Sequence, residues 1–122
     1  MMVEIFVAKS AELKEGDRRI ISHEGQEIGV IRAQGALHAY RNRCPHQGGP
    51  ACEGLLIHKV EEIIAPDKTY QGMRFSDDIL HLVCPWHGWE FNVATGRCAG
   101  DGKHGLLKHR VIEHDGGVYV AI

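Results

Sequence analysis

Short runs of alternating apolar and polar residues, separated by turn-forming residues, extend along most of this chain. At the N-terminal end, Val3, Ile5 and Val7 fall on one face of an alternating segment. Gly, Asp and Glu divide the runs that follow. The pattern predicts strands at residues 3–8, 18–23, 27–33 and 36–41, and a hairpin over 108–122 that is closed by Asp115-Gly116-Gly117.

One segment after the first strand has a helical pattern instead. In residues 10–17, Ser10 is a candidate N-cap and Gly16 a candidate stop, which predicts about one helical turn. The chain contains 15 glycines among 122 residues, and closely spaced strands with Gly-rich turns are typical of sandwiches and small barrels. We therefore predict an all-β fold, an antiparallel β sandwich.

Length and composition indicate one globular domain over 1–122, without a nucleic-acid or membrane partner. The chain is 43% hydrophobic with a net charge of −2. Lys and Arg are not clustered as phosphate binding requires, and the basic pair in GDRRI (16–20) is interpreted as a solvated strand end. No apolar run approaches about 18 residues, and the N-terminus does not resemble a signal peptide. We expect a cytoplasmic location, where the four cysteines stay reduced.

Two stiff loops each present one thiol and one imidazole. CPHQGGP begins with Cys44 and has His46 two positions on, whereas CPWHGWEF begins with Cys84 and has His87 three positions on. Proline follows each cysteine and glycine comes within two residues of each histidine, which stiffens the loop and lets backbone N–H groups approach an anionic sulfur. Two thiolates and two imidazoles suit either zinc or an iron–sulfur cluster.

The paired motifs resemble those of Rieske-type iron–sulfur proteins, C-x-H and C-x-x-H followed by Gly. The resemblance includes the β-rich flanks and spans essentially the whole chain. It implies one [2Fe-2S] cluster in a small two-loop cluster-binding subdomain, with Cys44 and Cys84 on one iron and His46 and His87 on the other. A zinc-stabilised binding module without redox activity is the alternative from another class.

Within that family, the chain resembles the ferredoxin components of bacterial aromatic-ring-hydroxylating dioxygenase systems. The cytochrome-complex branch has a disulfide between its cluster loops at the positions held here by Gly49 and Trp86, so that disulfide cannot form. Trp89 replaces a serine that donates a hydrogen bond to the cluster in that branch. Fewer polar donors predict a reduction potential in the lower part of the Rieske range, which protein-film voltammetry measures.

The resemblance implies a one-electron carrier, not an enzyme, that passes electrons from a flavin-dependent reductase to a terminal ring-hydroxylating oxygenase. Large oxygenase subunits have a catalytic iron domain after a similar Rieske domain, and the 31 residues after Phe91 are too few for one. A small subunit or accessory of a nitrite reductase, or of another oxidoreductase, is the alternative electron-transfer role.

The spacing between the two motifs departs from the family pattern. Between His46 and Cys84 lie 37 residues, more than twice the usual number in these ferredoxins. The surplus is an insertion at about 55–78, with turns expected at Pro66-Asp67 and at 76–78 and a short strand or helical turn at 58–64. The insertion either shapes docking and shields the cluster or is a decorated loop without a specific function, since loops tolerate insertion at little cost.

Other residues near the loops are expected to have structural roles. Cys52 and Cys98 lack the ligand pattern and are expected to be small buried side chains. Trp86 and Trp89 are expected to pack beneath the second loop, although Trp86 at its tip is also a candidate contact for a redox partner. Gln47, at the tip of the first loop, is a second candidate contact.

Overall fold

The computed structural model describes residues 3–45, 48–86, 88–99 and 104–122, and for 60–62 and 75–78 it describes the backbone alone. These ranges contain two 3-10 helices (η), neither of which is long or apolar enough to cross a membrane. The elements are β1 Glu4–Lys9, η1 Ser10–Glu12, β2 Arg18–His23, β3 Gln26–Ala33, β4 Ala36–Arg41, η2 Ala51–Glu53, β5 Leu55–Ile64, β6 Tyr70–Val83, β7 Glu90–Asn92, β8 Lys108–His114 and β9 Gly117–Ala121.

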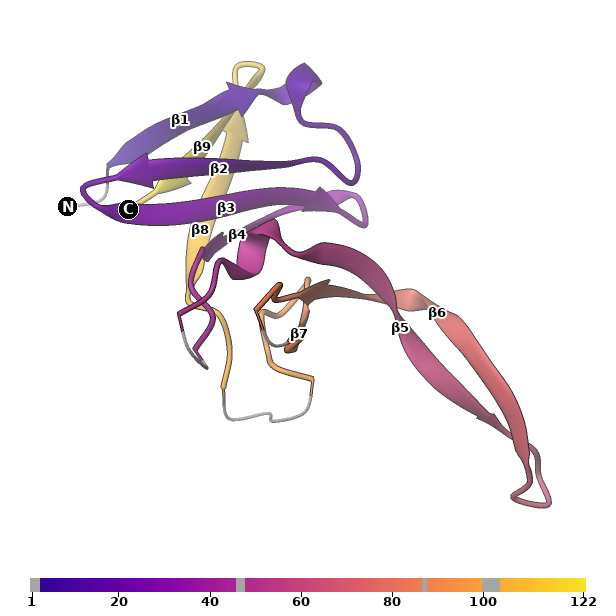
Figure 1. Ribbon diagram of the computed structural model, residues 1–122. Helices are drawn as coiled ribbons and strands as arrows, with labels where there is room; N and C mark the ends of the chain where they lie inside the picture. The colour runs from indigo at the N-terminus through magenta and orange to yellow at the C-terminus, as the bar shows by residue number, and fades with distance from the viewer. Residues whose placement is uncertain (1–2, 46–47, 87, 100–103) are drawn as a thin grey trace.

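The strands form two antiparallel sheets (Figure 1). The larger sheet has the order β1-β9-β8-β4-β3-β2, and the smaller has the order β5-β6-β7. In the larger sheet, β4 and β8 are joined at Ala39↔His109 and Tyr40↔Lys108. This short seam lets the sheet curl, so that β1 comes near β2. The predicted all-β class with antiparallel sheets is confirmed.

Tight turns close the hairpins that the sequence predicted. Glu24-Gly25, Gln34-Gly35 and Asp115-Gly116 each have two consecutive positive φ angles, between 49° and 80°. Positive φ at both central residues is the mark of the type I′ turn, whose twist matches that of the flanking strands. The C-terminal turn is one residue shorter than predicted, because Gly117 already belongs to β9.

The helical turn expected after the first strand is the 3-10 helix η1, but its cap differs from the prediction. Ser10 is the first residue of η1 rather than its N-cap, which is Lys9. The Lys9 N–H donates to Glu12 Oε1 at 3.0 Å, which is the bond that the N3 carboxylate forms in a capping box.

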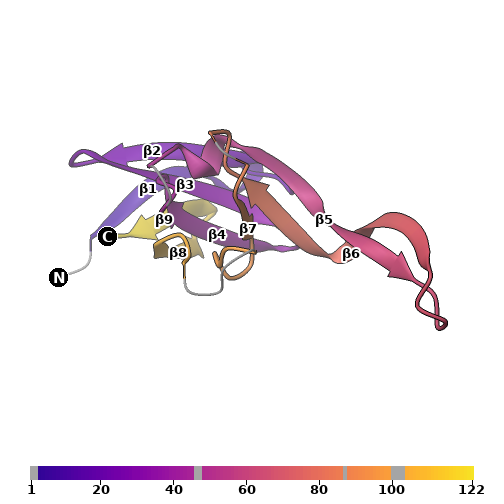
Figure 2. The same cartoon turned by 60° about the horizontal axis from the view of Figure 1, so that its bottom comes forward.

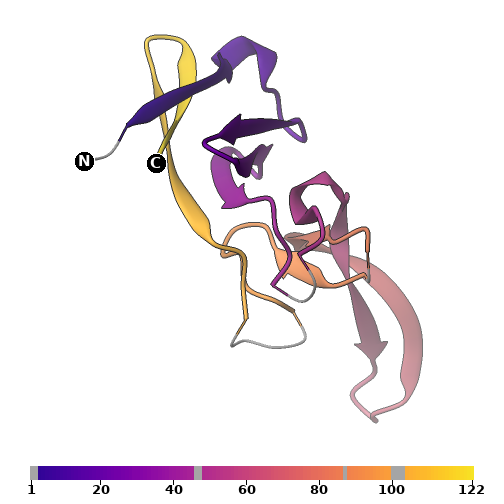
Figure 3. The same ribbon diagram turned by 60° about the vertical axis from the view of Figure 1, so that its left-hand side comes forward.

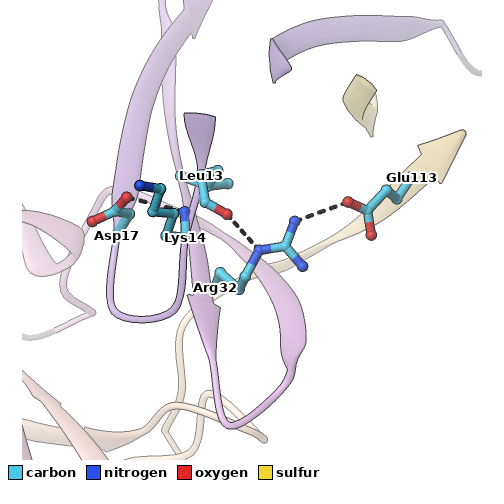
Figure 4. A network of polar contacts seen from close by, with 5 residues as sticks. All are labelled: Leu13, Lys14, Asp17, Arg32 and Glu113. Atoms are coloured by element: carbon cyan, nitrogen blue, oxygen red, sulfur yellow. Dashed lines mark hydrogen bonds and ion pairs between the residues drawn. The ribbon is translucent and has the colours of Figure 1, made fainter. Parts of the chain in front are cut away.

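Arg32 in β3 fixes the segment after η1 to the curled sheet (Figure 4). Its Nε donates to Leu13 O, and its Nη2 donates to Glu113 Oε2 in β8 at 2.8 Å. Within the same segment, the Lys14 N–H donates to Asp17 Oδ2 at 3.0 Å. One guanidinium therefore joins three elements that are distant in the sequence.

Two clusters of buried side chains form the core. The core inside the curled sheet comprises Val7, Ala8, Leu13, Ile28, Val30, Ala39, Val118 and Val120. The core between the large sheet, the small sheet and the two cysteine loops comprises Ile31, Ala33, Tyr40, Cys44, Ala51, Cys52, Leu82, Cys84, Phe91, Val93, Cys98 and Leu106. All four cysteines therefore belong to the second core, at the end of the molecule that carries the small sheet.

The insertion lies in the long β5–β6 hairpin, which belongs to the small sheet and extends away from the large sheet (Figures 1 to 3). β5 and β6 pair from Leu55↔Val83 at the root to Ile64↔Tyr70 near the tip. The turn predicted at Pro66-Asp67 is present, with the Lys68 N–H donating to Ala65 O at 2.8 Å. The turn predicted at 76–78 is wrong, because these residues continue strand β6. The β5–β6 register shifts at this point, between Val60↔Phe75 and His58↔Leu80, so the extra residues of β6 form an irregularity within the strand rather than a turn.

Candidate metal centre

The two cysteine loops lie at the ends of strands that meet at the second core. The first loop follows β4, and the second connects β6 to β7. Cys44 is 3% exposed and Cys84 is 1% exposed, and neither forms a disulfide. Two buried thiols from loops far apart in sequence thus belong to one core.

The first loop is closed by two backbone hydrogen bonds. The Cys44 N–H donates to Gly49 O at 2.7 Å, and the Gly48 N–H donates to Cys44 O at 2.9 Å. Gly48 has φ +77°, a conformation that L side chains rarely adopt.

The second loop repeats this backbone arrangement position by position. The Cys84 N–H donates to Trp89 O at 2.8 Å, and the Gly88 N–H donates to Cys84 O at 3.0 Å, with Gly88 at φ +72°. The sequence signal for this repeat is C-P-x-x-G, shared by both loops. The N–H groups of Gly48 and Gly88 bond to the cysteine carbonyls, and the expectation that backbone N–H groups of these loops approach an anionic sulfur stays a prediction.

Gly49 brings the two loops into contact. A Cβ added at Gly49 would lie 2.8 Å from Cγ of Trp86 and 3.1 Å from Sγ of Cys84. The first loop therefore approaches the second so closely that only glycine fits between them. This contact places the Cys84 sulfur against the backbone of the Cys44 loop.

The donor set and its surroundings fit an iron–sulfur cluster. Both thiols are buried and in no disulfide, and matched turns present them from facing loops. Thiolates protected from water in stiff loops are the ligands that such clusters use. His46, His87 and the candidate contact Gln47 lie outside the described residues, so the expected two-plus-two ligand set stays a prediction.

Arg18 in β2 joins the large sheet to the segment that leaves the first loop. Its Nη1 donates to Cys52 O at 2.9 Å and to Gly54 O. A Cβ at Gly54 would lie 1.5 Å from Val83 O, so this position passes tightly over the strand that leads into Cys84. The interpretation of GDRRI as a solvated strand end is therefore wrong for Arg18, whose guanidinium positions the loop exit.

Cys52 and Cys98 are buried, as predicted. Cys52 is fully buried, and its Sγ donates to Tyr40 O at 3.5 Å. Burial raises the pKa of the Cys52 thiol to about 12. The sulfur packs over β3, where a Cβ at Gly29 would lie 2.6 Å from it. A thiol kept protonated in this way is a poor metal ligand.

The two tryptophans of the second loop differ in their environments. Trp89 is half-buried and packs against the second core, with its ring centroid 6.4 Å from that of His104. Trp86 is 56% exposed at the loop tip. Packing beneath the loop is therefore confirmed for Trp89 and wrong for Trp86, which keeps its candidacy as a contact residue.

A buried histidine that the sequence analysis did not single out connects the two strands on either side of the second loop. His81 in β6 is 4% exposed, and its Nδ1 lies 3.0 Å from Oε1 of Glu90 in β7. Glu90 is paired with Val83, directly before Cys84. The side-chain bond ties together the two strands between which the loop is held.

Comparison with known proteins agrees with this arrangement. The Rieske [2Fe-2S] domain family matches residues 3–109 of the chain. A 4beta-methylsterol monooxygenase of Methylococcus capsulatus is 35% identical over 94 residues, which are 71% of this chain and 20% of that protein. The ferredoxin component of the alkene monooxygenase system of Xanthobacter autotrophicus is 27% identical over 86 residues, 70% of this chain and 54% of that one.

Solved structures have the same fold along the whole chain. One chain in the complex of reduced oxygenase and oxidized ferredoxin in carbazole 1,9a-dioxygenase is 26% identical with a TM-score of 0.70, covering 98% of this chain and 93% of that chain. A putative NADH-dependent nitrite reductase small subunit from Mycobacterium tuberculosis has a TM-score of 0.73 at 16% identity, covering 100% and 96%. The latter likeness shows the fold alone.

The chain spans between 12% and 54% of the length of the curated relatives it matches. The match to the Rieske family nevertheless includes both cysteine loops and most of each sheet. The chain belongs to the Rieske [2Fe-2S] domain family, whose domains bind a [2Fe-2S] cluster and act as electron carriers.

Proposed function

We propose that this chain is a one-electron ferredoxin that passes electrons from a flavin-dependent reductase to a ring-hydroxylating oxygenase. Its cluster ligands are Cys44, His46, Cys84 and His87. The observation that carries the ligand assignment is the pair of matched turns, because they present Cys44 and Cys84 as buried thiols from loops that touch at Gly49.

The bound [2Fe-2S] group supplies the capacity to accept and release one electron. The two thiolates and two neutral imidazoles give the oxidised site a charge near zero, so an added electron meets less repulsion than it would among four thiolates. Burial of both cysteines excludes water from the sulfur ligands. The repeated hydrogen bonds hold each cysteine backbone in place, so the ligand geometry needs little rearrangement between oxidation states.

The choice of partner is supported by two relatives. One is a chain in the carbazole 1,9a-dioxygenase complex of oxygenase with ferredoxin, and the other is a ferredoxin component of an alkene monooxygenase system. The nitrite reductase small subunit shares only the fold, at 16% identity. An oxygenase partner therefore has the stronger support.

We further propose that residues 1–122 form a single Rieske domain, in which the β5–β6 hairpin is an insertion at about 55–78. The two buried cores share strands β3 and β4, which supports cooperative folding as one unit. Urea unfolding should show one transition, with the same midpoint by far-UV circular dichroism and by cluster absorbance. Two separate transitions would contradict the single domain.

The ligand assignment is tested by substituting histidines and cysteines one at a time. His87→Ala and Cys84→Ala should lose or alter the visible absorption and the EPR signal of the reduced protein, which has an average g below the free-electron value in Rieske centres. His58→Ala, at an exposed histidine of β5, is the matched control and should leave both spectra unchanged. A colourless wild-type protein that contains one zinc ion would end the redox assignment.

The partner assignment is tested with the reductase and oxygenase components of a carbazole dioxygenase system. Reduced protein mixed with the oxidised oxygenase should regain its oxidised absorption on the stopped-flow timescale. Transfer to a nitrite reductase but not to the oxygenase would replace the proposed partner while leaving the electron-carrier role intact.

A further inference from the structure

Two arginines lie at the start of the first cluster loop. Arg41 ends β4, and Arg43 lies directly before Cys44. The Arg41 N–H donates to Leu107 O at 2.8 Å, which fixes this strand end beside the chain that enters β8. The loop that carries the first pair of proposed ligands therefore has a cationic flank.

The Arg43 guanidinium lies over the first loop itself. A Cβ added at Gly48 would lie 3.5 Å from Arg43 Nε and 3.6 Å from its Nη2. Gly48 is only four residues from Cys44 and has a positive φ. The charge is thus exposed to solvent and lies close to the loop.

Both arginines border hollows on this flank. With Pro45, Gly48 and Leu107 they line one of about 430 Å³, and both also line a neighbouring one of about 360 Å³. Leu107 is 56% exposed at the edge of the first hollow. A charged rim around an exposed apolar side chain is the composition of a protein contact surface.

Neighbouring carboxylates leave this charge available. Among the described residues, neither Arg41 nor Arg43 forms a salt bridge. Glu27 also lines the smaller hollow, but its Oε1 accepts a hydrogen bond from Asn42 Nδ2 at 3.4 Å. Asn42 Nδ2 also donates to Glu53 Oε2 at 2.9 Å. Both carboxylates therefore accept a hydrogen bond from the side-chain amide of Asn42.

We propose that Arg41, Arg43 and Leu107 form a docking surface for a redox partner that presents carboxylates around its own electron-transfer site. This inference rests on the proposed function, because it takes the cluster to be held by the loop that Arg43 covers. It deepens that function by naming the charge of the partner surface. The positive charge of this surface is opposite to the net charge of the whole chain. That net charge is −2 and on its own would repel an acidic partner.

The positive charge of the docking surface and the negative net charge of the whole chain predict opposite effects of salt on the rate of electron transfer to a charged partner. Dithionite-reduced protein is mixed in a stopped-flow instrument with trianionic tris(oxalato)cobaltate(III) or with tricationic hexaamminecobalt(III). In each reaction the cluster loses one electron and Co(III) is reduced to Co(II). The second-order rate constant is measured from about 0.01 M to about 1 M ionic strength, over which the Debye length falls from about 30 Å to about 3 Å.

If the cationic surface governs encounter, the rate with the anionic complex falls as salt is added, while the rate with the cationic complex rises. At low salt, R41Q/R43Q should slow the anionic reaction about tenfold. R41K/R43K should keep the rapid reaction, since it keeps the charge. Lys14→Gln removes one charge at an exposed site at the opposite end of β3 and should change the rate little.

The outcomes separate this inference from the proposed function. An anionic rate that rises with salt, or a rate equally slow in Lys14→Gln and in R41Q/R43Q, would overturn the docking surface. A protein that binds no cluster and cannot be reduced would overturn the proposed function instead. Retained visible absorption in every variant shows that the rate changes do not come from cluster loss.

Discussion

At the scale of single residues, burial does not distinguish a ligand cysteine from a structural one, because all four cysteines are buried. What separates them is the backbone around each thiol. Cys44 and Cys84 begin turns closed at matched positions, whereas Cys52 lies in η2 and donates to Tyr40 O. The Cys52 sulfur is already used in packing and hydrogen bonding within the core.

We predict that Cys52→Ala keeps the cluster but lowers the free energy of unfolding by about 1 kcal/mol, through one lost buried contact and one weak hydrogen bond. The measurement is urea denaturation together with visible absorption per mole of protein. Cys44→Ala is the comparison and should lose the absorption. Loss of the cluster in Cys52→Ala alone would show that this thiol is a ligand.

The sequence predicted these residues unevenly, for a physical reason. Stiff loops with a Cys-Pro start are local features, so Cys44 and Cys84 were found from their spacing. The role of Arg18 was not found, because the carbonyl groups that it binds, at Cys52 and Gly54, lie more than 30 residues away. No local pattern encodes that approach, since it depends on how β2 packs against η2.

At the scale of elements, the hairpins with type I′ turns were predictable and the end of the insertion was not. A turn such as Asp115-Gly116 needs a backbone conformation that few residues tolerate, so its sequence is informative. Residues 76–78 have turn-forming chemistry yet form part of β6. They lie at a register shift within the 14-residue β6, and how β6 pairs with β5 on either side of that shift is not visible in a local window.

The hairpin should be removable without loss of the fold. His58 and Leu80 are directly opposite in the β5–β6 ladder, so replacing residues 59–79 with Asn-Gly leaves a two-residue loop in register. The hairpin side chains that contact the second core are at its root, Leu56, Leu80 and Leu82. We predict that cluster absorption is retained and that the free energy of unfolding changes by less than about 1 kcal/mol, because a two-stranded ribbon is marginal by itself.

The same truncation separates the two interpretations of the insertion. Toward its tip, Ile64, Tyr70 and Met73 are between 52% and 61% exposed. If the hairpin shapes docking, the truncated protein reduces the oxygenase more slowly while its rate with cobalt complexes is unchanged. An unchanged rate with the oxygenase would contradict a role in docking and would favour an insertion without a specific function.

A histidine bridge between β8, β1 and the C-terminal turn should make stability depend on pH. His114 Nε2 lies 2.9 Å from Glu4 Oε1 and its Nδ1 lies 3.1 Å from Asp115 Oδ2, while its ring stacks on Tyr119 at 4.3 Å. The hydrogen bond to Glu4, and then that to Asp115, raises the pKa of His114 above 6.5. The stabilisation is therefore complete below the unfolded-state pKa and is lost as pH rises through the folded-state pKa.

We predict that His114→Gln destabilises the protein at about pH 5.5 and much less at about pH 9, where the wild-type imidazole is neutral. Urea denaturation of both proteins at the two pH values gives the difference. His23→Gln, at the end of β2, controls for a general effect of losing a histidine. A difference that does not change with pH would show that stacking on Tyr119, rather than charge, is what His114 contributes.

At the scale of the whole molecule, the two cores stand in different relations to the proposed cluster. Cys44 and Cys84 belong to the core beneath the small sheet, and the core inside the curled sheet contains neither of them. β4 belongs to both cores through Ala39 and Tyr40. The packing inside the curled sheet thus does not require the cluster. The two cysteine loops, in contrast, depend on the curled sheet and on the cluster.

We therefore predict that cluster removal loosens one end of the molecule. Ligand binding stabilises the segments that fold around the ligand. In the cluster-free protein, hydrogen exchange should therefore be at least about tenfold faster at the amides of Cys44, Gly48, Cys84 and Gly88. A tenfold increase corresponds to a loss of about 1.4 kcal/mol in the free energy of local opening. The amides of Val118 and Val120 in β9, within the other core, should change little. Hydrogen exchange measured by mass spectrometry on the same sample before and after removal makes the comparison. Equal acceleration in β9 and in the loops would mean that the cluster holds the whole fold together, because the curled sheet would then lack an independent core.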